Sequence, residues 1–235
     1  MKILIIIPAY NESKSIVRVV NDLSVHCPSF DILIINDGSH DRTADLCRAH
    51  GYPLLDLPVN LGISGAFSAG MKYAFRHGYD GAIQFDADGQ HRCEFIQPMV
   101  NKLAEGYDIV CGSRYLTGRR PFTLRMLGSR MISLAIRLTT GKKLTDPTSG
   151  LRLYTRSIIQ QFATQINYTP EPDTVSYLIR AGARVTEVPV IIDDRVTGES
   201  YFSAVVALRY MLRICVSILL VQWLRCRCYI ENGDI

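Results

Sequence analysis

The sequence predicts an α/β fold with a mostly parallel sheet and helices on its faces. Short apolar runs alternate with helical patterns through the first 112 residues. Parallel neighbours need a crossover about as long as a helix, and this alternation supplies one. The chain has 235 residues, 48% of them hydrophobic, which is enough to fill one large core. Disordered and mini-protein classes are therefore excluded.

The expected elements follow one another in a regular order. Strands are predicted at residues 2–7, 31–35, 54–57, 82–85 and 109–111. Helices are predicted between them at residues 13–25, 41–50, 63–76 and 93–105. Two longer helices are expected at 121–139 and 203–227. The sequence contains no internal repeat and no low-complexity linker, which favours a single domain with a C-terminal extension.

Cysteine usage and hydropathy limit the setting of the protein. The seven cysteines contain no repeated CxxC pair, which argues against a disulfide framework and a structural zinc site and favours a reducing, cytosolic setting. The apolar run near the start is too short for a signal peptide. The longest apolar window, 214–224, is bounded by Arg213 and Arg225 and is shorter than a membrane-spanning helix.

Charge is distributed unevenly along the chain. Residues 1–110 carry a net charge of −4 and residues 111–235 carry +8. The acidic half suits cation or hydroxyl binding, and the arginine-rich half suits phosphate groups or an anionic membrane surface. Residues 114–143 contain eight basic residues and no acidic ones. We interpret 121–139 as a basic amphipathic helix on a bilayer surface, the alternative being a core helix with a solvated face. Helix 203–227 repeats the pattern and adds Trp223.

Polar motifs follow four of the predicted strands, at residues 8–12, 36–39, 60–62 and 86–91. Ligands of such sheets gather at the carboxyl ends of strands, so one edge of the sheet is the expected site. The GxGxxG, GxxxxGK[ST], GxSxG and HExxH motifs are absent. Their absence argues against a dinucleotide-binding oxidoreductase, a P-loop kinase, an α/β-hydrolase and a zinc protease.

Two of these motifs offer aspartates. Asp86 and Asp88 follow a strand closely, and such oxygen ligands suit a divalent cation that bridges to a diphosphate. The alternative is a polar loop with a turn at Asp88-Gly89. Asp37 could bind a ribose or a base edge, or it could belong to a turn and helix cap together with Gly38.

Six motifs follow one another along the chain: Pro8-Ala9-Tyr10-Asn11-Glu12, Asn36-Asp37-Gly38-Ser39, Asn60-x-Gly62, 86–91, Gly112-Ser113-Arg114 and 146–152. Together they resemble the family 2 glycosyltransferases with a GT-A fold, and most of all their polyprenyl-phosphate and dolichyl-phosphate-mannose subgroup. The resemblance runs from Met1 to about Ser203. It implies a catalytic domain over 1–202 and a C-terminal amphipathic helix over 203–235 for membrane contact or oligomerisation. It implies inverting transfer from a UDP- or GDP-sugar to a polyprenyl phosphate by a peripheral enzyme at the cytoplasmic membrane face. No nucleic-acid partner is expected.

The resemblance also assigns roles to residues. Asp86, Asp88 and Gln90 would hold Mg²⁺ or Mn²⁺, and Arg114, Arg125 and Ser129 would receive the lipid phosphate. Asp88 is the first catalytic candidate, followed by Asp146 and Glu171, although Asp146 could equally cap a helix. Tyr201 replaces the basic residue that many relatives carry after Ser200. The donor-binding positions are Pro8, Ala9, Tyr10, Glu12, Asp37, Gly62, Asp86, Ala87, Arg195 and Ser200.

Other functions stay open at this level. Transfer to a saccharide hydroxyl would need a carboxylate base. A nucleotide-sugar-binding scaffold without catalysis is a second alternative, based on Tyr201. Relatives often continue into two membrane-spanning helices, whereas this sequence ends soon after Arg227. A small integral membrane partner or self-association is therefore expected to supply the anchoring.

Overall fold

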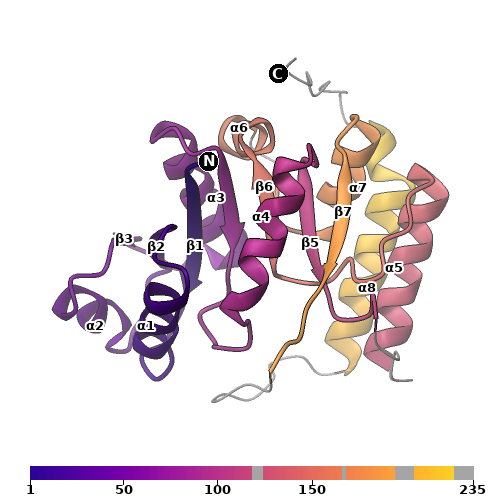
Figure 1. Ribbon diagram of the computed structural model, residues 1–235. Helices are drawn as coiled ribbons and strands as arrows, with labels where there is room; N and C mark the ends of the chain where they lie inside the picture. The colour runs from indigo at the N-terminus through magenta and orange to yellow at the C-terminus, as the bar shows by residue number, and fades with distance from the viewer. Residues whose placement is uncertain (118–123, 166–167, 194–203, 225–235) are drawn as a thin grey trace.

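A computed structural model describes residues 1–117, 124–165, 168–193 and 204–224 (Figure 1). Within these residues the strands form one sheet of seven strands in the order β3-β2-β1-β4-β6-β5-β7. The strands are β1 (Ile3–Ala9), β2 (Asp31–Asn36), β3 (Leu54–Asp56), β4 (Gly81–Gln84), β5 (Ile109–Ser113), β6 (Arg152–Thr155) and β7 (Val185–Pro189).

The sheet is mostly parallel, as the alternation predicts. Strands β1 to β4 pair in parallel, and so do β5 and β7. Strand β6 lies between β4 and β5 and runs antiparallel to both. The five predicted strands are confirmed, with small shifts at their ends, whereas β6 and β7 were not predicted. The start of β6 therefore meets the carboxyl ends of β4 and β5, because Arg152 pairs with Gln84 and with Cys111.

Helices cover both faces of the sheet. The four predicted between the strands are confirmed, and α6 and α7 were not predicted. The helices are α1 (Ile16–His26), α2 (Thr43–Ala49), α3 (Gly62–Arg76), α4 (Ile96–Ala104), α5 (Leu124–Thr140), α6 (Arg156–Thr164), α7 (Pro172–Arg180) and α8 (Ala204–Leu219), with 3-10 turns η1 (Cys93–Phe95) and η2 (Val221–Leu224).

Alternating side chains of β1 belong to two hydrophobic cores, one on each face of the sheet. Ile3, Ile5 and Ile7 pack with residues of α1 and α4, whereas Leu4 and Ile6 pack with residues of α3 and α6 on the opposite face of the sheet. Helix α1 buries Ile16, Val19, Val20 and Leu23, the spacing of one helical face. The sheet is thus held between two helical layers, and its loops are left free to build a site.

The two long helices form a third cluster beyond β7. Helices α5 and α8 lie side by side (Figure 1) and pack together with α7. Ile132 and Ile136 of α5 are buried against Ile214 and Ile218 of α8. Helix α5 is therefore a packing helix on one face, while its other face carries exposed apolar side chains. Among the described residues, no helix has the length and apolar character needed to cross a bilayer.

Candidate active site

The loop after β1 is tied to the loop after β2. Asn11 has a left-handed φ of 57°, which asparagine tolerates better than most residues. Its Oδ1 accepts hydrogen bonds from the backbone N–H groups of His40 and Asp41, at 2.9 and 3.3 Å. Its own N–H donates to Ser39 Oγ at 3.0 Å. Tyr10 stands exposed beside this junction, edge-on to the His40 ring.

A buried aspartate joins the loop after β3 to this group. Asp37 donates its N–H to Ala9 O, and its Oδ1 accepts the Leu61 N–H at 2.7 Å. Gly38 has a φ of 65°, and a Cβ there would lie 2.7 Å from Asn60 N, so only glycine fits. Gly62 begins α3 and donates to Asn60 Oδ1 at 3.0 Å. The loops after β1, β2 and β3 therefore form one hydrogen-bonded group.

Glu12 sits at the other end of the first motif. Its N–H donates to Thr43 Oγ1 at 2.8 Å, and its Oε2 accepts from Ser15 Oγ at 2.7 Å. Pro8 and Ala9 end β1, with Ala9 buried. The predicted donor residues from the first three loops therefore lie together at one edge of the sheet.

The two aspartates after β4 differ in their surroundings. Asp86 Oδ2 contacts Nε2 of the buried His91 at 2.9 Å. Asp88 Oδ1 accepts the Gln90 N–H at 3.0 Å, which shapes the turn. Ala87 between them is buried. The chain leaves the sheet here with two carboxylates in one short loop, as the sequence predicts.

Asp193, which follows β7, is hydrogen-bonded to this loop and to Arg92 just after it. Gln90 Nε2 donates to Asp193 O at 3.0 Å, and Asp193 N donates back to Gln90 O at 2.9 Å. Arg92 contacts the Asp193 carboxylate through Nε and Nη2, at 2.9 and 2.6 Å. The mutual bonds hold the pKa of Asp193 below its ordinary value, chiefly through the Arg92 hydrogen bond. Asp193 thus links the segment after β7 to residues 86–91, which we call the carboxylate loop.

The loop before β6 approaches the same carboxylates. A Cβ on Gly150 would lie 2.8 Å from Asp86 Oδ2, so glycine lets the backbone come close to that oxygen. Gly150 belongs to the segment 146–152, which the sequence also singled out. The antiparallel direction of β6 brings this segment to the edge where β4 ends.

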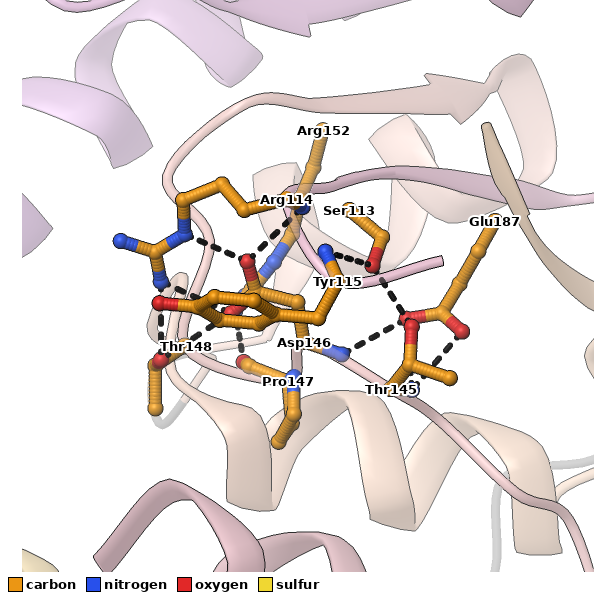
Figure 2. Close-up of polar contacts among 9 residues, drawn as sticks. All are labelled: Ser113, Arg114, Tyr115, Thr145, Asp146, Pro147, Thr148, Arg152 and Glu187. Carbon is orange, nitrogen blue, oxygen red and sulfur yellow. Dashed lines mark hydrogen bonds and ion pairs between the residues drawn. The ribbon is translucent and has the colours of Figure 1, made fainter. Parts of the chain in front are cut away.

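Arg114, which follows β5, pairs with the fully buried Asp146 in the loop before β6 (Figure 2). Arg114 donates to Asp146 through Nε at 2.6 Å, Nη2 at 2.8 Å and its backbone N at 3.2 Å. The exposed fraction of the side chain is 0% for Asp146 and 26% for Arg114. A planar guanidinium and a carboxylate match in this bidentate form, which fixes the arginine in place.

Glu187 of β7 holds the backbone on which Asp146 stands (Figure 2). Its carboxylate accepts the backbone N–H groups of Thr145, at 2.7 and 2.8 Å, and of Asp146, at 2.8 Å. Ser113 Oγ lies 2.6 Å from Thr145 Oγ1. Sequence reasoning missed Glu187, although a glutamate inside an otherwise apolar and β-branched run was the available signal.

A buried arginine connects this loop to α7. Arg152 donates to Pro147 O at 2.5 Å and to Pro170 O at 2.9 Å. Glu171, the predicted catalytic residue next to Pro170, precedes α7 and pairs with Arg213 of α8 at 2.9 Å. Burial raises the pKa of Glu171, and Arg213 opposes that shift.

The remaining predicted residues are placed only in part. Ser129 is buried in α5, and its Oγ has no hydrogen-bond partner within the described residues. Arg125 lies in the first turn of α5, with its side chain outside the described part. Arg195, Ser200 and Tyr201 fall outside the described residues. Their assigned roles stay predictions.

The geometry therefore gathers most of the predicted site along one edge of the sheet. The donor loops, the carboxylate loop and the Arg114–Asp146 pair come from strand ends, and β6 delivers the segment 146–152 between them. Asp193 was not predicted, and no local signal marked it, because it acts through contacts about a hundred residues away in sequence. Along this edge the carboxylates of Asp86 and Asp88 follow β4, and the Arg114 guanidinium, fixed by Asp146, follows β5.

Comparisons with known proteins agree with this arrangement. The profile described as glycosyl transferase family 2 matches residues 4–162. The undecaprenyl-phosphate mannosyltransferase of Micrococcus luteus is 34% identical over 86% of this chain and 88% of its own length. The polyprenol monophosphomannose synthase of Mycolicibacterium smegmatis is 30% identical over 85% of this chain and 80% of its own length.

Solved structures share the fold. One is the glucosyl-3-phosphoglycerate synthase of Mycobacterium tuberculosis in complex with Mn²⁺, UDP-glucose and phosphoglyceric acid. It superposes with a TM-score of 0.70 at 18% identity, covering 93% of this chain and 79% of its own. The sheet topology, the strand-end loops and the profile match place the chain in one family: it belongs to the family 2 glycosyltransferases.

Proposed function

We propose that this enzyme transfers a sugar, with inversion, from a nucleotide-sugar to a polyprenyl phosphate at the cytoplasmic surface of a membrane. The observation that carries the choice of acceptor is the Arg114–Asp146 pair, a cation fixed beside the carboxylate loop. The names of the Micrococcus and Mycolicibacterium relatives, which specify undecaprenyl phosphate and polyprenol, support the same acceptor class.

The donor half fits a divalent cation. Asp86 and Asp88 offer carboxylate oxygens, which are ligands that Mg²⁺ and Mn²⁺ prefer. Gln90 donates through Nε2 to Asp193 O, so Oε1 is the amide atom that can ligate a cation. Bound there, the ion would neutralise the departing diphosphate. A structural neighbour solved with Mn²⁺ and UDP supports this reading without deciding between the two metals.

The acceptor half fits an anion. Asp146 holds Nε and Nη2 of Arg114, which leaves Nη1 to face an incoming phosphate. Preorganised charge of this kind stabilises a transition state without reorganisation. A phosphate oxygen is already ionised at neutral pH, so the chain needs no strong base to activate it. Arg125 and Ser129 remain proposed further contacts of the same phosphate.

Transfer to a saccharide hydroxyl would need a carboxylate base, and two candidates are engaged elsewhere. Asp146 is buried and accepts two guanidinium hydrogen bonds, and Glu171 is paired with Arg213. Both are better suited to positioning arginines than to removing a proton. The contacts of these residues therefore favour the phosphate acceptor.

The outer faces of α5 and α8 fit a membrane surface. Exposed apolar side chains recur along both helices, and Arg130, Arg137, Arg209 and Arg213 are exposed beside them. Apolar side chains flanked by arginines are typical of helices that lie in the bilayer interface. We propose that residues 203–235 extend the 1–202 catalytic domain for this purpose. The apolar residues are Leu127, Met131, Leu134, Leu138, Leu212, Val216, Leu219, Leu220, Trp223 and Leu224.

The function is tested with the purified full chain, Mg²⁺ or Mn²⁺, a panel of radiolabelled UDP- and GDP-sugars and a short polyprenyl phosphate. We expect labelled product that partitions into organic solvent and requires both the metal and the lipid phosphate. Product formed only with a saccharide acceptor would replace this proposal. Donor binding without turnover across the whole panel would favour the scaffold alternative.

Membrane binding is tested by placing charge on the exposed face. We expect the double substitution Leu134→Glu and Leu138→Glu to weaken co-sedimentation with anionic vesicles about tenfold or more, since burying one leucine is worth roughly 1.5–3 kcal/mol. Val25→Glu with Val59→Glu is the matched control, because both valines are exposed, Val25 on α1 and Val59 in the loop between β3 and α3, in parts of the chain outside α5 and α8. The control should bind as the wild type does.

Three outcomes would count against the membrane surface. If the Leu134→Glu and Leu138→Glu variant bound vesicles as strongly as the wild type, the exposed face of α5 would not be the membrane contact. Unchanged vesicle binding, with a change from dimer to monomer in light scattering, would assign the face to a second copy. A requirement for a small membrane protein in the vesicles would assign it to an integral partner.

A further inference from the structure

Three side chains of different chemistry meet on the α1 side of the sheet, away from the donor loops. Asp22 and His26 lie one turn apart on α1, and Cys93 begins η1. Their ligand atoms all lie within 4.8 Å of one another. Asp22 Oδ1 is 3.1 Å from His26 Nδ1, and Asp22 Oδ2 is 3.4 Å from Cys93 Sγ.

These spacings suit a tetrahedral ion. Bond lengths to zinc place neighbouring oxygen and nitrogen ligands about 3.3 Å apart, and oxygen and sulfur ligands about 3.5 Å apart. The observed separations of 3.1 and 3.4 Å are close to these values, but they join His26 and Cys93 to different oxygens of Asp22, so the carboxylate would have to turn one oxygen toward the ion. A carboxylate, an imidazole and a thiol are also the ligand set that borderline-soft metals prefer over Mg²⁺.

A cavity adjoins the three side chains and leaves room for a fourth ligand. Its volume is about 680 Å³, and Asp22, His26 and Cys93 line it together with His91. His91 is buried, and its Nδ1 has no hydrogen-bond partner within the described residues. The same ring holds Asp86 through Nε2. The cavity thus adjoins the residue that positions the donor-site carboxylate.

We propose that Asp22, His26 and Cys93 form a second metal site, for Zn²⁺ or a similar transition metal, with solvent as the fourth ligand. The site is separate from Asp86 and Asp88 and does not depend on the proposed reaction. On binding, the Cys93 thiol loses its proton to solvent, and the sulfur–metal bond replaces the hydrogen bond to Asp22. His26 Nδ1 gives up its contact with the Asp22 carbonyl oxygen, and the ring carries its proton on Nε2. The ion would fasten α1 to η1, which directly follows the carboxylate loop.

Co²⁺ provides the test, because a thiolate ligand gives a sulfur-to-cobalt charge-transfer band in the near ultraviolet that oxygen ligands do not give. We expect the full chain to show this band, Cys93→Ser to abolish it and Asp88→Ala to keep it. Cys215→Ser is the matched control, since Cys215 is a buried cysteine in α8 with no place in the cluster. Circular dichroism checks that each variant folds.

Zn²⁺ calorimetry gives a second readout. His26→Ala should weaken Zn²⁺ binding at least about tenfold, because in other metal sites the loss of a group that only orients a ligand already costs that much. His50→Ala should leave affinity unchanged, because His50 contacts the carbonyl four residues earlier just as His26 does but stands outside the cluster. A cobalt band that survives in Cys93→Ser, or zinc affinity that is equal in both histidine variants, would overturn the proposal.

Discussion

The substitution Asp88→Ala is expected to lower turnover by roughly a hundredfold to a thousandfold or more, the usual cost of removing a group that stabilises developing charge. The side chain lies in the loop after β4, beyond the strand pairing that holds the sheet. Its Oδ1 accepts the Gln90 N–H, and losing that bond costs about 1 kcal/mol of stability. The variant should therefore fold while turnover of labelled donor collapses.

A second variant separates charge from loop shape. Asp88→Asn keeps an oxygen for the Gln90 N–H but removes the negative charge. We expect it to match the alanine variant in activity and the wild type in thermal midpoint. Asp45→Ala, at an exposed position on α2, is the control and should retain full turnover. More than a tenth of wild-type activity in Asp88→Ala would contradict the assignment of this carboxylate to the metal.

Removal of the Asp146 carboxylate is expected to give the largest loss of stability. Asp146→Ala leaves the guanidinium of Arg114 mostly buried without its partner, and breaking a buried pair in this way costs about 3–5 kcal/mol. Urea unfolding of the wild type, Asp146→Ala and Arg114→Ala measures that cost. The double variant Arg114→Met with Asp146→Leu should be less destabilised than Asp146→Ala, because no charge is left buried.

The kinetics of milder variants distinguish positioning from base catalysis. We expect Asp146→Asn to raise the KM for polyprenyl phosphate far more than the KM for the nucleotide-sugar, since Arg114 loses its charged anchor. A catalytic base would instead lower kcat at unchanged acceptor KM and would remove the acidic limb of the pH profile. That result would restore Asp146 as a base and favour the saccharide acceptor.

The first half of the fold could be predicted because each element there carries a simple period. Strand β1 is an unbroken apolar run, and α1 buries every third or fourth residue. Helix α7 shows why the second half could not. It has only nine residues, too few for a reliable periodicity, and it buries Asp173, Thr174 and Ser176 along with its apolar side chains. Strand β6 has four residues that include an arginine, too short a signal to identify.

The residues of the candidate site that could be predicted are those that directly follow the end of a strand. Asp86 and Asp88 follow a strand directly, and parallel strands bring their carboxyl ends to one edge. Glu187 and Asp193 escape such reasoning because their partners are distant in sequence. Glu187 accepts backbone N–H groups in the loop before β6, and Asp193 contacts Gln90 and Arg92. Glu187 meets Asp146 only because β7 pairs with β5 in one particular register. That register is set by tertiary packing rather than by any local pattern.

The reversed strand β6 also affects how the chain must assemble. Because β6 joins β4 to β5, the sheet remains two separate pieces while synthesis has not passed residue 155. Until then β4 and β5 each present an open edge, the kind of surface that pairs with foreign strands. The ribosome must therefore release more than half of the polypeptide before the central gap can close. Chaperone protection of the nascent chain matters most during that interval.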